Sequence, residues 1–169
     1  MIQPSPDFTQ LITEMFAQSD RASAVVAASV LDELLERCLV RFIREDKKAK
    51  ELMFDVYKPM SSFKAKTDLA YFLSLLSHDE RSDLDTIRRI RNDFAHKFDT
   101  LTFSSPGIET LCTQLVGFRR TNPPAELKLS PLDTFRFCVT LLAGRLDHLS
   151  KVIPRITDYQ ALSESLLVK

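Results

Sequence analysis

Seven apolar residues near the end of the chain alternate at spacings of three and four, and this pattern constrains the fold more than any other. They are Leu132, Phe135, Val139, Leu142, Leu146, Leu149 and Ile153. Because heptad spacing places all seven side chains on one helical face, it predicts a long helix that Pro131 opens and Pro154 ends. This seam is either the inner face of the central helix of a bundle, a dimer interface, or a docking surface for a partner.

The remaining segments also predict helices. Apolar residues at helical spacing indicate them over about 8–16, 21–45, 50–55, 62–76, 80–96, 106–115 and 158–167. We expect Val26 and Phe72 to point inward, Asp79 to cap the helix that follows it, and Phe103 to fold back onto the core. The sequence therefore predicts an all-α, single-domain multi-helix bundle of about seven or eight helices, spanning residues 1–169.

The small number of glycines and the balance of charges argue against several classes of function. The chain has three glycines, far apart, which excludes a Gly-rich loop for a dinucleotide or a nucleoside triphosphate. It has 23 Lys and Arg against 23 Asp and Glu. This balance disfavours a protein that binds DNA on its own, because neutralisation of phosphates usually requires a basic excess.

We expect no metal and no cofactor. Asp93 and His96 have helical metal-ligand spacing, but a di-metal bundle needs a second such pair, which the chain lacks. The cysteines, which have no paired spacing, are expected to be small buried hydrophobes in a reducing cytosol: Cys38, Cys112 and Cys138. The first residues do not resemble a signal peptide, and the apolar stretch 22–31 is too short to span a bilayer. These features predict a soluble, cytoplasmic protein without membrane contact.

The hexapeptide from Arg91 to His96 carries the chemistry that is most informative about function. Arg88, Asn92 and His96 lie four residues apart and so share one polar stripe of a helix, with Arg91 on its flank. Arginine presents a permanently charged fork of donors, and histidine exchanges a proton near neutral pH. The same residues are also suited to ending a helix, where cations complement the dipole. The segment is therefore either an anion or phosphodiester site, or a helix end.

A second set of basic residues lies at regular spacing in the helix predicted over 21–45 and shortly after it. Its members are Arg37, Arg41, Arg44 and Lys48. Their spacing of four, three and four predicts one basic stripe. The stripe is either a solvated helix surface or a contact for an anion or RNA. Arg89 and Asp93, four apart, are expected to form a surface ion pair.

The spacing of Arg91 and His96 resembles the signature of HEPN domains, the higher-eukaryote and prokaryote nucleotide-binding helical domains. Many of these all-helical proteins are metal-independent ribonucleases, and two copies of the motif commonly meet across a dimer. The resemblance implies that His96 acts as general acid or base and that Arg91 stabilises charge on the phosphate. Asn92 would position a group by hydrogen bonding.

A wider resemblance covers roughly residues 10–150. The segments 22–43, 63–71 and 84–111 are similar to the mannitol operon repressor family (MltR and its paralogues), most clearly from Arg88 to Ile108. This MltR-like resemblance implies a bacterial, cytosolic, all-helical regulator that lowers expression of a mannitol transport and catabolism operon. The sequence shows no helix-turn-helix with a basic recognition helix.

These observations predict a transcriptional regulator that acts mainly through protein–protein contacts, as a homodimer and with other regulatory proteins. Direct operator reading is not expected. A HEPN-type ribonuclease or RNA-binding domain that uses Arg91, Asn92 and His96 is the alternative. The binding candidates are Arg88, Arg91, Asn92, His96, Arg37, Arg41 and Arg44.

Overall fold

The computed structural model describes residues 6–43, 46–97, 100–122, 124 and 127–154, and within these ranges all regular structure is helical. The helices are α1 (Pro6–Phe16), α2 (Asp20–Val40), α3 (Lys47–Phe54), α4 (Phe63–Phe72), α5 (His78–His96), α6 (Pro106–Gln114), α7 (Gly117–Arg120) and α8 (Pro131–Val152). This architecture confirms the prediction of an all-α bundle.

Four helices begin at serine residues whose side chains satisfy first-turn N–H groups. They are Ser19 before α2, Ser62 before α4, Ser77 before α5 and Ser130 before α8. Ser77 forms a full capping box with Glu80, whose carboxylate accepts the N–H of Ser77 at 2.8 Å. The prediction that Asp79 caps this helix was therefore wrong, because the serine two residues earlier offers the better cap.

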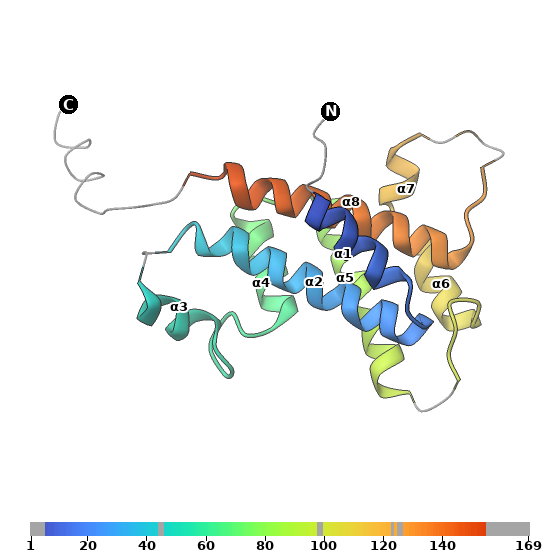
Figure 1. The fold of residues 1–169 in the computed structure, drawn as a ribbon, viewed down its shortest axis with the longest axis horizontal. Coiled ribbons are helices and arrows are strands. Elements are labelled where there is room, and N and C mark those ends of the chain that lie inside the picture. The colour runs from blue at the N-terminus through green and yellow to red at the C-terminus, as the bar shows by residue number, and fades with distance from the viewer. Residues whose placement is uncertain (1–5, 44–45, 98–99, 123, 125–126, 155–169) are drawn as a thin grey trace.

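The two longest helices lie side by side through the centre of the bundle and run in the same direction (Figure 1). Arg136 near the start of α8 donates to the carbonyl of Phe16 at 2.9 Å, and Arg41 after α2 donates to that of Ile153 at 3.0 Å. Ala24, Ala27 and other small residues of α2 are buried, which allows close packing against neighbouring helices. α5 packs on α2 and α4, and α6 covers α5 and α8.

The heptad seam of α8 lies inside the protein. Phe135, Val139, Leu142, Leu146 and Ile153 are buried, and the ring of Phe135 stacks on that of Phe103 with centroids 4.8 Å apart. The seam is thus the inner face of a central helix, and it is not available as a docking surface. Phe103 also contacts Phe94 of α5, at 5.1 Å between centroids, which confirms that this segment folds back onto the core.

Several sequence-based predictions differ from the structure. Val26 and Phe72 are exposed instead of inward, with 76% of Phe72 accessible to solvent. The helix predicted over 21–45 ends at Val40, and Asp46 begins α3 by accepting the N–H of Lys48 at 2.9 Å. Because an aspartate is a strong N-cap, α3 begins at Lys47, three residues before the short helix predicted over 50–55. The helix predicted over 158–167 lies outside the described residues.

The segment between α6 and α7 is held by a buried carboxylate. Asp83 of α5 accepts the N–H groups of Val116 at 2.8 Å and Gly117 at 2.9 Å. Burial raises the pKa of Asp83, and the two backbone donors oppose that rise. A β-carbon at Gly117 would lie 3.1 Å from Sγ of Cys138 and 3.2 Å from Oδ2 of Asp83. The close approach of this turn to α5 and α8 therefore favours glycine at residue 117.

Replacing Gly117 with alanine is expected to lower the free energy of unfolding by about 1–3 kcal/mol, because buried neighbours must move to admit the methyl group. Gly107 provides a matched control, since a β-carbon there meets nothing within 4 Å. Gly107→Ala is expected to be neutral or stabilising by up to about 1 kcal/mol. Urea denaturation measures the free energy of unfolding of both variants. Equal free energies of unfolding would show that the turn can accommodate a β-carbon at residue 117.

Candidate functional site

A cavity of about 450 Å³ opens between α2, the start of α4 and the middle of α5. Its lining residues are Ala28, Ser29, Asp32, Glu33, Ser61, Ser62, Phe63, Lys64, Arg88, Arg91 and Asn92. α5 is amphipathic: Leu84, Ile87 and Ile90 are buried on its inner face, whereas Arg88, Arg91 and Asn92 are only partly covered. The fold thus brings together three of the binding candidates that the sequence identified.

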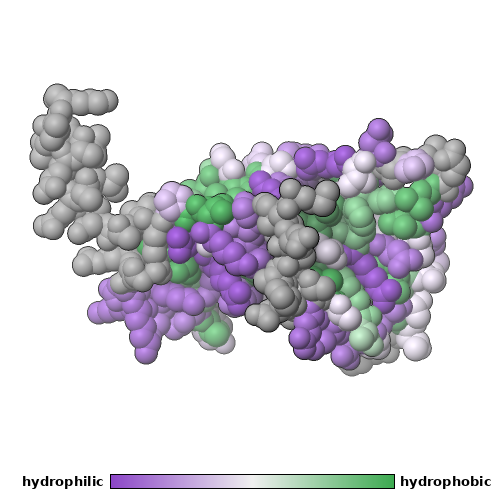
Figure 2. All heavy atoms as spheres, turned by 45° about the horizontal axis from the view of Figure 1, so that its top comes forward, coloured by the Kyte–Doolittle hydropathy of each residue, from purple (hydrophilic) through white to green (hydrophobic). Residues whose placement is uncertain are grey.

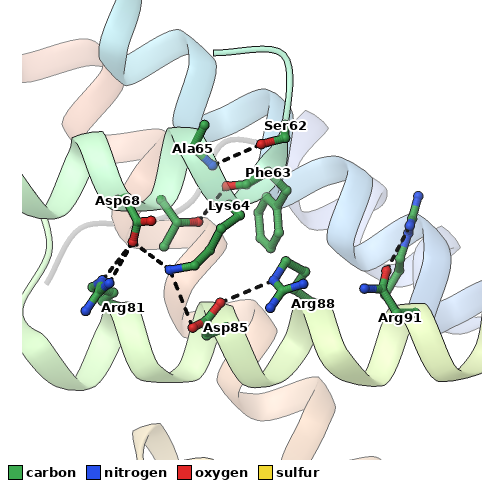
Figure 3. A network of polar contacts seen from close by, with 11 residues as sticks. Ser62, Phe63, Lys64, Ala65, Asp68, Arg81, Asp85, Arg88 and Arg91 are labelled. Atoms are coloured by element: carbon green, nitrogen blue, oxygen red, sulfur yellow. Dashed lines mark hydrogen bonds and ion pairs between the residues drawn. The ribbon is translucent and has the colours of Figure 1, made fainter. Parts of the chain in front are cut away.

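One side of this cavity is bounded by a network of ion pairs between α4 and α5 (Figure 3). Lys64 lies 2.7 Å from Asp68 and 3.7 Å from Asp85, and Arg88 contacts Asp85 through Nε at 3.2 Å. Arg81 also donates to Asp68, at 2.8 Å. Hydrogen bonds from Lys64 and Arg81 hold the pKa of Asp68 below its ordinary value. The network orients Lys64 and Arg88 beside the cavity.

Arg91 has a different environment from the other two cations. Its guanidinium donates to Oδ1 of Asn92 at 3.0 Å, and no carboxylate in the described part of the chain pairs with it. In Figure 3 the side chain of Arg91 rises from α5 toward α2, one turn beyond Arg88. A charged guanidinium that lacks a carboxylate and borders a cavity is available for a ligand anion.

The two carboxylates of the α2 wall are already paired with cations of the protein. Asp32 accepts from the buried Lys66 at 3.0 Å, and Glu33 accepts from Arg37 at 3.1 Å. These pairs offset the negative charge of the wall. The second oxygen of Asp32, Oδ1, is buried and has no hydrogen-bond partner among the described residues. The cavity therefore combines two carboxylates that are paired with cations and one arginine, Arg91, that is not paired with a carboxylate.

His96 does not join this site. It is the last residue of α5, is exposed, and is absent from the lining of the cavity. The end of α5 is instead capped by Arg21 of α2, which donates to the carbonyls of Phe94 and Lys97. Within one protomer, His96 lies one turn of α5 beyond Asn92 and outside the lining of the cavity.

The basic stripe predicted from Arg37 to Lys48 is divided between two elements, although Arg37 and Arg41 line one shallow pocket of the surface. Arg37 is paired with Glu33, Arg41 caps the end of α8, and Lys48 belongs to the separate helix α3. Arg44 lies outside the described residues. Arg41 therefore has a structural role at a helix end, where a cation complements unsatisfied carbonyls. The predicted ion pair of Arg89 and Asp93 was wrong as well: Asp93 pairs with Lys97 at 2.8 Å, and Arg89 donates to Gln114.

The cysteines are buried, as expected. Burial raises the pKa of Cys38 to about 11, that of Cys112 to about 12 and that of Cys138 to about 11. At neutral pH these thiols are protonated and unreactive.

Across the described ranges, no group of three or more His, Cys, Asp or Glu side chains is placed to hold a metal ion. In the same ranges, no helix has the length and apolar character needed to cross a membrane.

Lys64 and the first turn of α4 were not among the candidates from the sequence. They lie more than twenty residues from Arg88 along the chain, and only the packing of α4 on α5 brings them to the same cavity. The one local signal is the spacing of Lys64 and Asp68, which predicts a helical ion pair but gives no hint of a cavity.

Comparison with known proteins identifies the fold. No family model and no curated protein matches this sequence. Among solved structures, one chain of the X-ray structure of the MtlR–HPr complex from Escherichia coli is similar, with a TM-score of 0.69. The two share a fold. The alignment covers 85% of this chain and 99% of that chain at 16% sequence identity.

Proposed function

We propose that this protein is a bacterial transcriptional regulator of the mannitol operon repressor type, which acts mainly through protein–protein contacts. The observation that carries the proposal is the shared fold with a chain of the MtlR–HPr complex, over nearly the whole of that chain. The sequence resemblance to the mannitol operon repressor family supports the same assignment. Zero net charge supports contact with proteins over direct reading of an operator.

The surface offers apolar side chains for such contacts. Val56 and Tyr57, which follow α3, are 73% and 97% exposed, and Leu52 of α3 is also exposed. In Figure 1, α3 projects from one end of the bundle, and Figure 2 shows hydrophilic residues gathered around that end, with smaller apolar areas along the same face. Exposed aromatic and aliphatic side chains can contribute contact area to a protein interface.

The proposed partner class is a small protein of the HPr kind, because the structural neighbour was solved with HPr. Isothermal titration of the purified chain with HPr from the same organism is expected to show saturable binding. An unrelated acidic protein of similar size serves as the control. Failure to bind HPr would remove this partner while leaving the regulatory role to be tested in cells.

The regulatory role predicts a change in transcription. Deletion of the gene is expected to raise transcript levels of the mannitol operon, and expression of the wild-type chain from a plasmid should restore them. Transcripts that do not change with deletion, both with and without mannitol, would contradict the proposal.

We also propose a homodimer, for which light scattering should report twice the 19.3 kDa of one chain.

A HEPN-type ribonuclease or RNA-binding domain is the second candidate, favoured by the location of Arg91 and Asn92 at an open cavity. His96 is exposed and lies outside the lining of that cavity, so under this alternative it would meet Arg91 and Asn92 of a second protomer. His96→Ala is expected to change the free energy of unfolding by less than about 0.5 kcal/mol. Neither the wild type nor the variant is expected to cleave structured or single-stranded RNA. Cleavage by the wild type that the variant abolishes would establish the ribonuclease instead.

A further inference from the structure

The cavity between α2, α4 and α5 contains donor groups that converge from two helices. Arg88 uses only Nε toward Asp85, so its two terminal nitrogens have no partner within the described residues. Arg91 uses one nitrogen toward Asn92. Lys64 borders the same space from α4. Lys64 comes from α4 and Arg88 from α5, and in Figure 3 the ammonium of Lys64 is directed toward Asp68 and Asp85.

The first turn of α4 adds backbone donors to this set. Ser62 caps the helix and takes the N–H of Ala65 at 3.1 Å. The N–H groups of Phe63 and Lys64, both in the lining of the cavity, have no partner inside their own helix. They supplement the charged groups of the site, Arg88, Arg91 and Lys64.

The geometry points to a binding site for the phosphate group of a small phosphorylated metabolite, held by Arg88, Arg91 and Lys64. A cavity of about 450 Å³ is of the size that encloses a small molecule. A phosphate monoester has three terminal oxygens and so can accept from guanidinium and ammonium donors on several sides. A carboxylate has two oxygens in one plane and matches this distribution of donors less well.

Charge compensation supports an anion over a neutral ligand. Asp32 and Glu33, the carboxylates of the lining, are paired with Lys66 and Arg37, and Oδ1 of Asp32 is buried without a hydrogen-bond partner among the described residues. Arg91 is the cation of the lining for which the described structure supplies no carboxylate. Asn92 accepts one N–H of Arg91 and so holds the guanidinium in place. Preorganised donors of this kind reduce the entropy lost when a ligand binds.

Calorimetric titration of the full chain at low ionic strength tests the site, with inorganic phosphate and glycerol 3-phosphate as probes and glycerol and acetate as controls. The wild type is expected to bind both phosphate probes and neither control. Arg91→Gln is expected to weaken binding about tenfold or more, since it removes both the charge and the fork. Arg91→Lys keeps the charge and should therefore lose less affinity for phosphate than Arg91→Gln.

Arg89→Gln is the matched control, because it removes the same charge from the same helix at an exposed residue that contacts Gln114 instead of the cavity. It should change affinity less than about twofold. Denaturation curves confirm that each variant is folded. Equal weakening by Arg91→Gln and Arg89→Gln, equal binding of acetate, or no saturable binding of phosphate would overturn the proposal. So would Arg91-dependent binding of a short RNA in the absence of binding to glycerol 3-phosphate. These results are independent of HPr binding and transcript levels, so either proposal can fail alone.

Discussion

Replacing Phe135 with alanine is expected to lower the free energy of unfolding by about 3–5 kcal/mol. The side chain is 0% exposed and lies in the buried seam of α8. Its ring stacks on Phe103, which in turn stacks on Phe94 of α5, so the three rings join α8, the segment before α6 and α5. Truncation leaves a cavity at the point where these elements meet.

Phe72→Ala is the matched control, because it removes the same atoms from a side chain that is 76% exposed. Its effect should be within about 0.5 kcal/mol. Equilibrium urea denaturation at pH 7, monitored by circular dichroism, gives both values. A loss for Phe135→Ala similar to that for Phe72→Ala would contradict the placement of the α8 seam in the core.

The core could be predicted where a long helix is buried along one whole face. The seam of α8 keeps its period over 22 residues, so spacing alone identified its inner side chains. The prediction was wrong for Phe72, which is the last residue of a ten-residue helix. At a helix end the chain turns away from the bundle, so the hydrophobicity of a residue no longer predicts whether its side chain points toward the core. Phe103 was correctly expected inside because an aromatic residue in an irregular segment gains most by packing on the core.

The candidate site could be predicted only along its own helix. Spacing of four correctly placed Arg88 and Asn92 on one face, and both line the cavity. The same rule extended to His96, which is exposed and lies outside the lining of the cavity. The opposite wall, with Lys64 and the first turn of α4, depends on how two helices pack. That information is tertiary and is not contained in any local spacing.

A second large effect is expected at Lys66, a buried ammonium group that joins α4 to α2. It is 4% exposed and donates to Asp32 at 3.0 Å and Glu36 at 2.9 Å. Lys50 also pairs with Glu36, at 3.2 Å. Burial lowers the pKa of Lys66, but its bonds to Glu36 and Asp32 more than offset this, so the pKa is raised and Lys66 is charged at neutral pH.

Lys66→Met is expected to lower the free energy of unfolding by about 2–4 kcal/mol at pH 7, because it leaves two partly buried carboxylates side by side. Lys64→Met, two residues away in the same helix, is the control. Lys64 is 38% exposed and belongs to a surface network, so its replacement should cost less than about 1 kcal/mol. Equal losses would show that the burial of Lys66 does not strengthen its ion pairs.

The pH dependence separates lost charge pairing from lost packing. Burial raises the pKa of Glu36, and the bonds from Lys66 and Lys50 outweigh that effect, so the pKa is lowered in the wild type. A lowered carboxyl pKa contributes stability that is present above the unfolded pKa and is lost as the pH falls through the folded pKa. Lys66→Met removes the main cause of the lowering, so acid should destabilise the variant less than the wild type. The difference in unfolding free energy should therefore narrow as the pH falls from 7 to about 4. A difference that stays constant over this range would mean that Lys66 stabilises the protein by packing of its aliphatic chain instead of by its charge.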